Sequence, residues 1–327
     1  MESSFPPIKA TQFSLNSHMH LLHTFGKLKL SESHPKPAVK FTMSNITMYG
    51  LKDVHMPTEG YSIVKNSILN PSNHGYGPSV GLLDARTTIA ETFSGENLKL
   101  QPNDVFITNN TGVALFYIML SFCNEGDNIL IPNVGFPFFL KVTKLYKVNL
   151  KIYRLRSEKD WEVDLDDLEA KIDERSKFIL IVNPSNPFGS IFSKDHCLDI
   201  IALAKKKQIA IFSDEIYYDM TYPKKNFYSL GHLTNDLPVV TMYGMEKIYL
   251  TTGWSIGWLI LYDQNGVLSD VKKGMGNVAQ ICLHSNTFIQ ASLPDLLKKI
   301  GPSFCKEKIM PTLNEHKKRL VKEFEDI

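Results

Sequence analysis

The fold of this chain is decided at Asn183-Pro-Ser-Asn-Pro-Phe-Gly189, a turn-forming segment that follows the apolar run 178–182. The apolar run predicts a buried strand, and the prolines and glycine predict a turn where it ends. Two further polar segments follow apolar runs, Ser213-Asp-Glu-Ile-Tyr217 and Glu246-Lys247. Ligands of parallel α/β sheets bind beyond the carboxyl ends of the strands, so we expect the three segments to meet at one edge.

The three segments together carry an unusual set of side chains. They supply an amide, a carboxylate, a phenol and an amine, from Asn186, Asp214, Tyr217 and Lys247. A pyridoxal-phosphate site uses this set. The amine condenses with the aldehyde, the carboxylate keeps the ring nitrogen protonated, and the amide and phenol bond the phenolic oxygen of the ring. The segments therefore predict a pyridoxal-phosphate site.

Strand and helix patterns alternate along most of the chain. Strands are expected at 104–108, 128–131, 148–153, 178–182, 209–212 and 239–242, and helices at 57–70, 84–93, 113–122, 138–145, 165–172 and 194–207. Beyond Gly257 only helices are expected, at 267–274, 279–291, 293–300 and 311–324. This alternation predicts an α/β protein with a mostly parallel sheet covered by helices on both faces.

Composition narrows the classes of protein that the chain can belong to. Its 327 residues predict two closely packed domains, and its net charge of +2 does not favour nucleic-acid or membrane partners. The four cysteines lack metal-ligand spacing, so we expect no metal site. We expect a cytoplasmic protein, because no secretory leader or membrane-spanning run is present in the sequence. Arginine is scarce and occurs only at Arg86, Arg154, Arg156, Arg175 and Arg319.

Additional motifs extend these observations from about residue 41 to the end. They are Gly75-Tyr-Gly-Pro-Ser-Val-Gly81, Asp127-Asn-Ile-Leu-Ile-Pro132, Trp161-Glu-Val-Asp-Leu165 and Gly253-Trp-Ser-Ile-Gly-Trp258. With them the chain resembles the class I/II pyridoxal-phosphate-dependent aminotransferases of fold type I, and within these the tyrosine aminotransferase group. The resemblance implies a mostly parallel large-domain sheet sandwiched by helices, with an incomplete small domain.

The resemblance also implies a division of the chain. Residues 1–40 form an N-terminal arm, and residues 41–262 form the large cofactor-binding domain, with early residues contributing to the small domain. Residues 263–327 form a helical connection and a partial C-terminal small domain.

Roles follow from the resemblance position by position. Lys247 matches the Schiff-base lysine, which also moves the substrate proton, and Asp214 matches the partner of the ring nitrogen. Asn186 and Tyr217 match the groups that bond the ring's phenolic oxygen, and Phe136 matches an aromatic ring stacked on the cofactor. Helix capping for the aspartate and core packing for the aromatic residues remain alternative roles.

The phosphate end of the cofactor is expected at a helix start. Asn109, Asn110 and Thr111 match the cup where backbone amides hold the phosphate. Tyr76 matches a tyrosine that reaches the phosphate of the neighbouring subunit, which implies a homodimer with shared sites.

Four positions depart from the family pattern. Ser255 replaces an arginine that clamps the phosphate, a loss of about 1.5–3 kcal/mol for a charge-assisted contact. Glu246 stands where a serine or alanine is usual and adds a negative charge. Asn110 replaces a small residue, and Ser44-Asn-Ile-Thr47 replaces a Gly-Asp-Pro-Thr segment.

The chain ends at Ile327, where family members continue with the arginine that binds the substrate carboxylate, and Arg319 does not match it. We therefore expect a fragment or isoform of a longer product, or a degenerate member. The implied function is transamination of an aromatic amino acid, tyrosine, with 2-oxoglutarate as acceptor. A catalytically impaired or non-catalytic homologue and a related C–S lyase remain alternatives.

Overall fold

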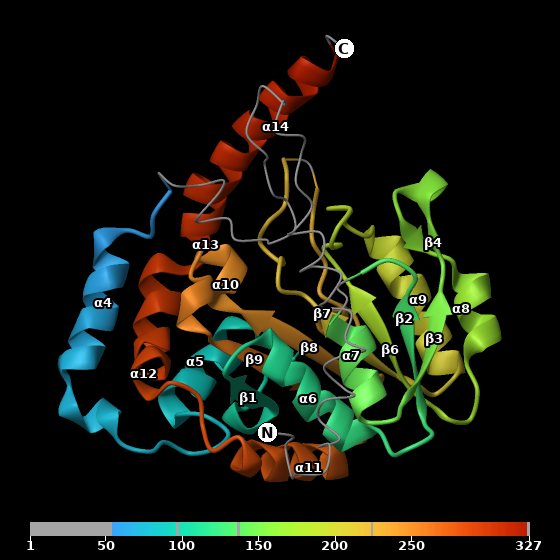
Figure 1. Ribbon diagram of the computed structural model, residues 1–327, viewed down its shortest axis with the longest axis horizontal. Helices are drawn as coiled ribbons and strands as arrows, with labels where there is room; N and C mark the ends of the chain where they lie inside the picture. The colour runs from blue at the N-terminus through green and yellow to red at the C-terminus, as the bar shows by residue number, and fades with distance from the viewer. Residues whose placement is uncertain (1–53, 96–97, 136–137, 224, 326–327) are drawn as a thin grey trace, which may run out of the picture.

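A computed structural model describes residues 54–95, 98–135, 138–223 and 225–325 of the chain (Figure 1). At its centre is a seven-stranded sheet in the order β1-β9-β8-β7-β6-β2-β3. The strands are β1 (Val105–Thr108), β2 (Asn128–Pro132), β3 (Asn149–Tyr153), β6 (Ser176–Val182), β7 (Ala210–Asp214), β8 (Val239–Gly244) and β9 (Gly257–Tyr262). β9 runs antiparallel to both of its neighbours, and the other neighbouring pairs are parallel. The predicted α/β class with a mostly parallel sheet is confirmed.

The central strands are apolar because both of their faces are covered. In β6, Ile179 and Ile181 belong to one hydrophobic cluster, whereas Phe178 and Leu180 belong to the other. Successive side chains of a strand point to opposite faces, so a strand between two helix layers needs apolar residues at every position. Each such side chain contributes roughly 1.5–3 kcal/mol through burial.

Helices form a layer on each face of the sheet (Figure 1). One layer contains α6 (Thr111–Phe122), α7 (Phe138–Leu145) and α11 (Ser269–Ile281). The other contains α5 (Leu83–Thr92), α8 (Leu165–Lys171), α9 (Lys194–Lys206) and α12 (Thr287–Asp295). Side chains cap four of these helices: Asn110 for α6, Asp164 for α8, Ser193 for α9 and Asn286 for α12. Such caps satisfy backbone amides that have no partner inside the helix.

The expectation that only helices follow Gly257 is wrong. Residues Gly257–Tyr262 form β9, and all of its residues are buried. A short apolar run without period cannot be assigned from sequence alone, and here pairing with β1 and β8 decides the outcome. The next helix also differs, because α11 continues through the expected break near Gly274 and ends at Ile281.

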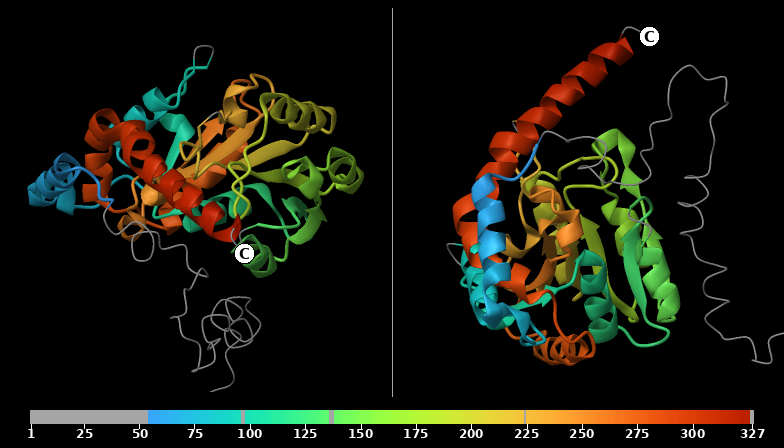
Figure 2. Two further views of the ribbon diagram at one scale, coloured as in Figure 1. Left: turned by 90° about the horizontal axis from the view of Figure 1, so that it is seen from above. Right: turned by 60° about the vertical axis from the view of Figure 1, so that its left-hand side comes forward.

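The remaining elements lie around this core. They are α4 (Thr58–Leu69), the small sheet of β4 (Leu155–Arg156) and β5 (Glu162–Val163), α10 (Met245–Ile248), α13 (Gly301–Phe304) and α14 (Met310–Glu325). The last helix projects away from the body, and Leu320 and Phe324 on it are exposed (Figure 2). Among the described helices, none is long and apolar enough to cross a bilayer. The expected arm, residues 1–40, lies outside the described residues, and the predicted domain division stays a prediction.

Candidate active site

The strand ends that carry the predicted site lie side by side. Val182, Asp214 and Met242 are aligned across β6, β7 and β8. On the other side, Gly244 of β8 is paired with Gly257 of β9, which is paired in turn with Thr108 of β1. The polar segments that follow β6, β7 and β8 therefore start from one edge, together with the start of α6.

A pocket of about 160 Å³ opens at this edge. It is lined by Thr111, Gly112, Leu115, Phe139, Asn186, Asp214, Ile216, Tyr217, Met242, Glu246, Lys247 and Thr252. Five residues predicted to hold the cofactor are thus brought together: Thr111, Asn186, Asp214, Tyr217 and Lys247.

The last residue of β7, Asp214, is a buried carboxylate. Its Oδ1 accepts a hydrogen bond from the backbone N of Ile216 at 3.3 Å. Burial raises the pKa of Asp214 to about 7; Glu246 adds to the rise, whereas the Ile216 amide and Lys247 oppose it. The carboxylate thus lacks a partner that compensates fully for its burial, and a cation in the pocket would stabilise its ionised form.

Lys247 lies in the short helix α10, directly after β8. Its Nζ is 5.9 Å from the centroid of the Tyr217 ring. Burial lowers the pKa of Lys247, although the charges of Glu246 and Asp214 oppose this. A lowered pKa increases the fraction of neutral amine, the form that attacks an aldehyde carbon.

Two neutral groups complete this side of the pocket. Burial, with the nearby charges of Asp214 and Glu246, raises the pKa of Tyr217 to about 12, so its hydroxyl stays a donor at ordinary pH. Asn186 lies in the turn after β6. This turn is connected to β7 by a hydrogen bond of 3.1 Å from the backbone N of Asn183 to the carbonyl of Asp214. The Asn183 side chain also accepts from the backbone N of Phe192 at 3.0 Å. The turn is therefore held in place on both sides.

The opposite side of the pocket is the start of α6. Asn110 caps this helix, because its Oδ1 accepts from the backbone N of Val113 at 2.9 Å. The other end of the same amide donates from Nδ2 to Ser255 Oγ at 3.2 Å. Two of the positions that depart from the family pattern are therefore in direct contact.

Glu246, a third departure, points into the same helix start. Its Oε1 accepts from the backbone N of Thr111 at 3.4 Å, and its side chain is only 8% exposed. A Cβ at Gly244 would collide with Glu246 Oε2, and one at Gly257 would lie 3.1 Å from the Thr111 N. Glycine at these two positions makes room for the carboxylate and for the close approach of β9. Burial raises the pKa of Glu246, opposed by the amides of Glu246 and Thr111 and by Lys247.

Three other predicted positions among the described residues, Asn109, Asn110 and Tyr76, are not part of the pocket lining. Asn109 and Asn110 flank it at the start of α6, and Tyr76 is 88% exposed, with its ring centroid 5.3 Å from that of His284. Phe136 and the segment 44–47 lie outside the described residues.

Sequence reasoning missed the residues that form much of the pocket wall, namely Gly112, Leu115, Phe139, Ile216, Met242 and Thr252. Gly112 and Ile216 adjoin predicted site residues in the sequence, which is the one signal that could have indicated them. The others come from β8 and from helices that approach this edge only in the folded chain.

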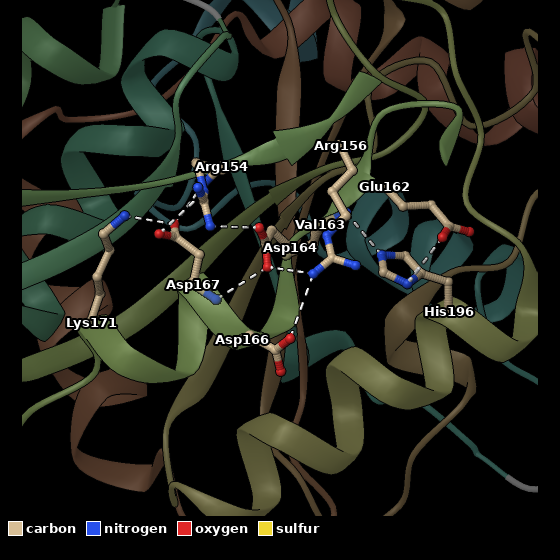
Figure 3. A network of polar contacts seen from close by, with 9 residues as sticks. All are labelled: Arg154, Arg156, Glu162, Val163, Asp164, Asp166, Asp167, Lys171 and His196. Atoms are coloured by element: carbon tan, nitrogen blue, oxygen red, sulfur yellow. Dashed lines mark hydrogen bonds and ion pairs between the residues drawn. The ribbon is translucent and has the colours of Figure 1, made fainter. Parts of the chain in front are cut away.

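Three of the five arginines are engaged by other residues, and none of the five lines the pocket. Arg156 and Arg154 bind the two oxygens of Asp164 through Nη2 atoms at 2.9 and 3.0 Å, in a network that also includes His196 (Figure 3). Arg86 donates to the carbonyls of Gly81 and Pro102. Among the described residues that line the pocket there is no arginine, so the side of the pocket at the start of α6 lacks a guanidinium. Nor do the described residues form a cluster suited to a metal ion.

Comparisons with known proteins agree with this architecture. The sequence profile described as aminotransferase class I and II matches residues 61–327. A tyrosine aminotransferase of Dictyostelium discoideum is 35% identical over 263 residues, covering 79% of this chain and 62% of that protein. The Homo sapiens tyrosine aminotransferase is 31% identical, covering 85% of this chain and 61% of that protein. The chain thus spans about three fifths of the length of these relatives.

Solved structures give the same result. A tyrosine aminotransferase from Leishmania infantum matches with a TM-score of 0.89 and 28% identity, over 99% of this chain and 79% of that chain. An alanine aminotransferase from Pyrococcus furiosus matches with a TM-score of 0.79 and 32% identity, over 84% and 69% of the two chains. The extent of the profile match and the shared fold lead to one conclusion: the chain belongs to the class I and II aminotransferases.

Proposed function

We propose that this pocket binds pyridoxal phosphate and transfers an amino group from an amino acid, tyrosine foremost, to a 2-oxo acid such as 2-oxoglutarate. Members of this family use pyridoxal phosphate and act on amino and 2-oxo acids. The observation that carries the proposal is the meeting of Lys247, Asp214, Tyr217 and Asn186 in one pocket at the carboxyl edge of the sheet. Tyrosine is favoured because tyrosine aminotransferases are prominent among the relatives.

The donor set fits the ring of this cofactor. A buried carboxylate with a raised pKa suits a cationic ring nitrogen, since the pair would offset the desolvation of both charges. Tyr217 and Asn186 offer neutral donors to the ring hydroxyl oxygen, and Lys247 offers the amine. Apolar groups of Leu115 and Ile216 line the same pocket and suit the ring faces. The phosphate end fits less well, because the Glu246 carboxylate already lies at the α6 start.

When bound, the cofactor supplies an aldehyde that condenses with amines and a ring that accepts the electron pair of a breaking bond. Lys247 would hold it through the amine and carry the proton removed from the substrate α-carbon on Nζ. Asp214 would hold the ring-nitrogen proton throughout, and Tyr217 and Asn186 would stabilise negative charge on the ring oxygen. The buried walls of the pocket would limit the access of water to the proton on Lys247.

The proposal includes a cytoplasmic homodimer. Tyr76 supports the dimer through its exposure, because a side chain predicted to reach the partner's phosphate must project from its own subunit. The predicted role of Phe136 as a ring-stacking residue, and those of Asn109 and Asn110 in the phosphate cup, remain part of the same proposal.

A catalytically impaired homologue is a second candidate, and one observation favours it. Glu246 places a carboxylate where the cofactor phosphate would have to lie, and Ser255 offers no positive charge to offset it. Such a protein would keep the pocket and the fold but load the cofactor weakly.

Amino-group transfer tests the proposal directly. The purified chain is incubated with pyridoxal phosphate, ¹⁵N-tyrosine and 2-oxoglutarate, and ¹⁵N-glutamate is measured by mass spectrometry. Formation of ¹⁵N-glutamate is the expected result. Release of a thiol from a cysteine conjugate, without glutamate formation, would instead indicate a C–S lyase. No turnover of any amino acid at saturating cofactor would leave the non-catalytic homologue.

A further inference from the structure

We infer that the Glu246 carboxylate is a built-in competitor for the cofactor phosphate at the start of α6, so that the pocket gains little from the phosphate group of its ligand. This inference rests on the proposed function, because it concerns how the same pocket selects its ligand. It makes Glu246 a specificity-determining residue that lowers the preference for pyridoxal phosphate over unphosphorylated pyridoxal.

The first support is that Glu246 occupies an anion site. The helix α6 has 12 residues, so its start carries unpaired amides and the positive end of a helix dipole. The Glu246 Oε1 accepts from the first of these amides, that of Thr111. A carboxylate at this position uses the same attraction that would bind a phosphate.

The second support is that the carboxylate is poorly compensated. Glu246 is 8% exposed, and its Oε2 has no hydrogen-bond partner among the described residues. A buried acceptor without a partner is costly unless another requirement retains it. The Glu246 side chain lines the pocket, and its unpaired Oε2 is buried beside Gly244, so an incoming anion would approach a carboxylate whose charge is not fully compensated.

The third support is that Ser255 and Gly244 accommodate the Glu246 carboxylate and offer no charge to offset it. An incoming phosphate would find Ser255, which is neutral and already accepts from Asn110. Gly244 is the residue whose missing Cβ leaves room for Glu246 Oε2. Removal of the negative charge of Glu246 should therefore change the affinity for phosphate more than removal of any single hydrogen bond would.

The charge state of Glu246 depends on the groups that surround it. Its neighbour on its own helix is Lys247, and the neighbour from β7 is Asp214. The loop after β7 contributes Tyr217, and α6 contributes the backbone amide of Thr111. Protonation removes the repulsion and leaves an O–H donor, so phosphate affinity should rise as the pH falls. Substitution by glutamine should remove the part of this pH dependence that belongs to Glu246.

The test compares Glu246→Gln with the wild type and with Glu125→Gln, which removes one charge from an exposed surface glutamate. Dissociation constants are measured by equilibrium dialysis for pyridoxal phosphate, pyridoxal and inorganic phosphate at about pH 6 and pH 8. We expect Glu246→Gln to lower the dissociation constants of pyridoxal phosphate and inorganic phosphate about ten-fold or more at pH 8. The dissociation constant of pyridoxal should change less than two-fold. Circular dichroism checks folding, and Glu246→Ser replaces the glutamine variant if that variant does not fold.

The outcomes separate this inference from the proposed function. Equal changes for pyridoxal and pyridoxal phosphate, or no change for either phosphate ligand, would overturn the inference and leave the proposed function standing. If neither aldehyde binds any variant but inorganic phosphate binds Glu246→Gln more tightly, competition for anions at the α6 start is supported, and the proposed function fails together with the ligand preference that rests on it. Equal tightening by Glu125→Gln would assign the effect to net charge and would also overturn the inference.

Discussion

The two sides of the pocket differ in how they match the chemistry expected of them. The amine side, formed by Lys247, Asp214, Tyr217 and Asn186, presents the amine, carboxylate, phenol and amide proposed to bond a pyridoxal ring. The anion side, at the start of α6, differs from the family pattern at three positions that lie together. Asn110 donates to Ser255, and Glu246 contacts the adjacent Thr111 amide.

Three of the four departures therefore form one local arrangement, and the fourth, at residues 44–47, lies outside the described residues. Loss of selection on the pocket would be expected to scatter substitutions over both sides. Here the side proposed to carry out the bond chemistry keeps the residues of the family pattern, and three changes gather where the ligand is proposed only to be held. Capture of an aldehyde can therefore persist while the contribution of the phosphate falls.

The largest effect should come from Asp214→Asn, which breaks the amine side. The amide cannot hold a cationic ring nitrogen, so the rate of amino-group transfer should fall about 10²-fold or more. Single-turnover measurement with tyrosine is the check, and Asp270→Asn on the surface is the matched control. A rate within a few-fold of wild type would separate Asp214 from catalysis.

The pH dependence of stability tests the burial of Asp214 in the cofactor-free protein. Its pKa is about 7 when folded against an ordinary value of 3.8, so the folded state keeps a proton that the unfolded state loses between these values. Stability should therefore fall as the pH rises from 4 through 7. From pH 5 to pH 8 this group should cost roughly 2–3 kcal/mol.

Urea unfolding of wild type and Asp214→Asn at both pH values measures this contribution by difference. Other buried acids, such as Glu215, whose pKa is raised to about 7, titrate in both proteins, so their contributions to stability cancel in the difference. An identical pH slope in the two proteins would show that Asp214 is not desolvated as described.

A change on the anion side should have a smaller and conditional effect. Ser255→Arg restores a guanidinium and should raise the affinity for pyridoxal phosphate about ten-fold when it is combined with Glu246→Gln. In the wild-type background the gain should be smaller, because the arginine would pair with Glu246. Dialysis on a double-mutant cycle measures the coupling, with Ser255→Gln as a neutral control. Strict additivity would argue that positions 246 and 255 act separately.

The smallest effect is expected for Tyr217→Phe. Loss of one neutral hydrogen bond should weaken cofactor affinity by about 1 kcal/mol, roughly five-fold. Tyr61→Phe, on the exposed part of α4, is the control. A loss larger than a hundred-fold would mean that the Tyr217 hydroxyl does more than bond the ring oxygen.

The sequence predicted much of this picture because its strongest signals are local. Proline and glycine after an apolar run identified the turn that carries Asn186, and strand–helix alternation identified the sheet. Gly257–Tyr262 was missed because pairing determines its structure: one partner, β1, is distant in sequence, and the other, β8, is separated from it by residues 245–256. Local patterns do not contain that information.

The anion side was predicted only in part for the same reason. Glu246 was recognised as an unusual charge, but its contact with Thr111 joins residues that are 135 positions apart. The contact between Asn110 and Ser255 spans 145 positions. Phe139 and Leu115 likewise reach the pocket from α7 and α6, helices that pack on the sheet only after folding.

The most direct test of the central claim is the site of attachment of pyridoxal phosphate. The protein is incubated with the cofactor, reduced with borohydride and digested, and the modified peptide is identified by mass spectrometry in wild type and Lys247→Ala. We predict one stoichiometric phosphopyridoxyl group on Lys247 and its loss in the variant. No stoichiometric modification of the wild type, or equal modification of both proteins, would contradict this assignment.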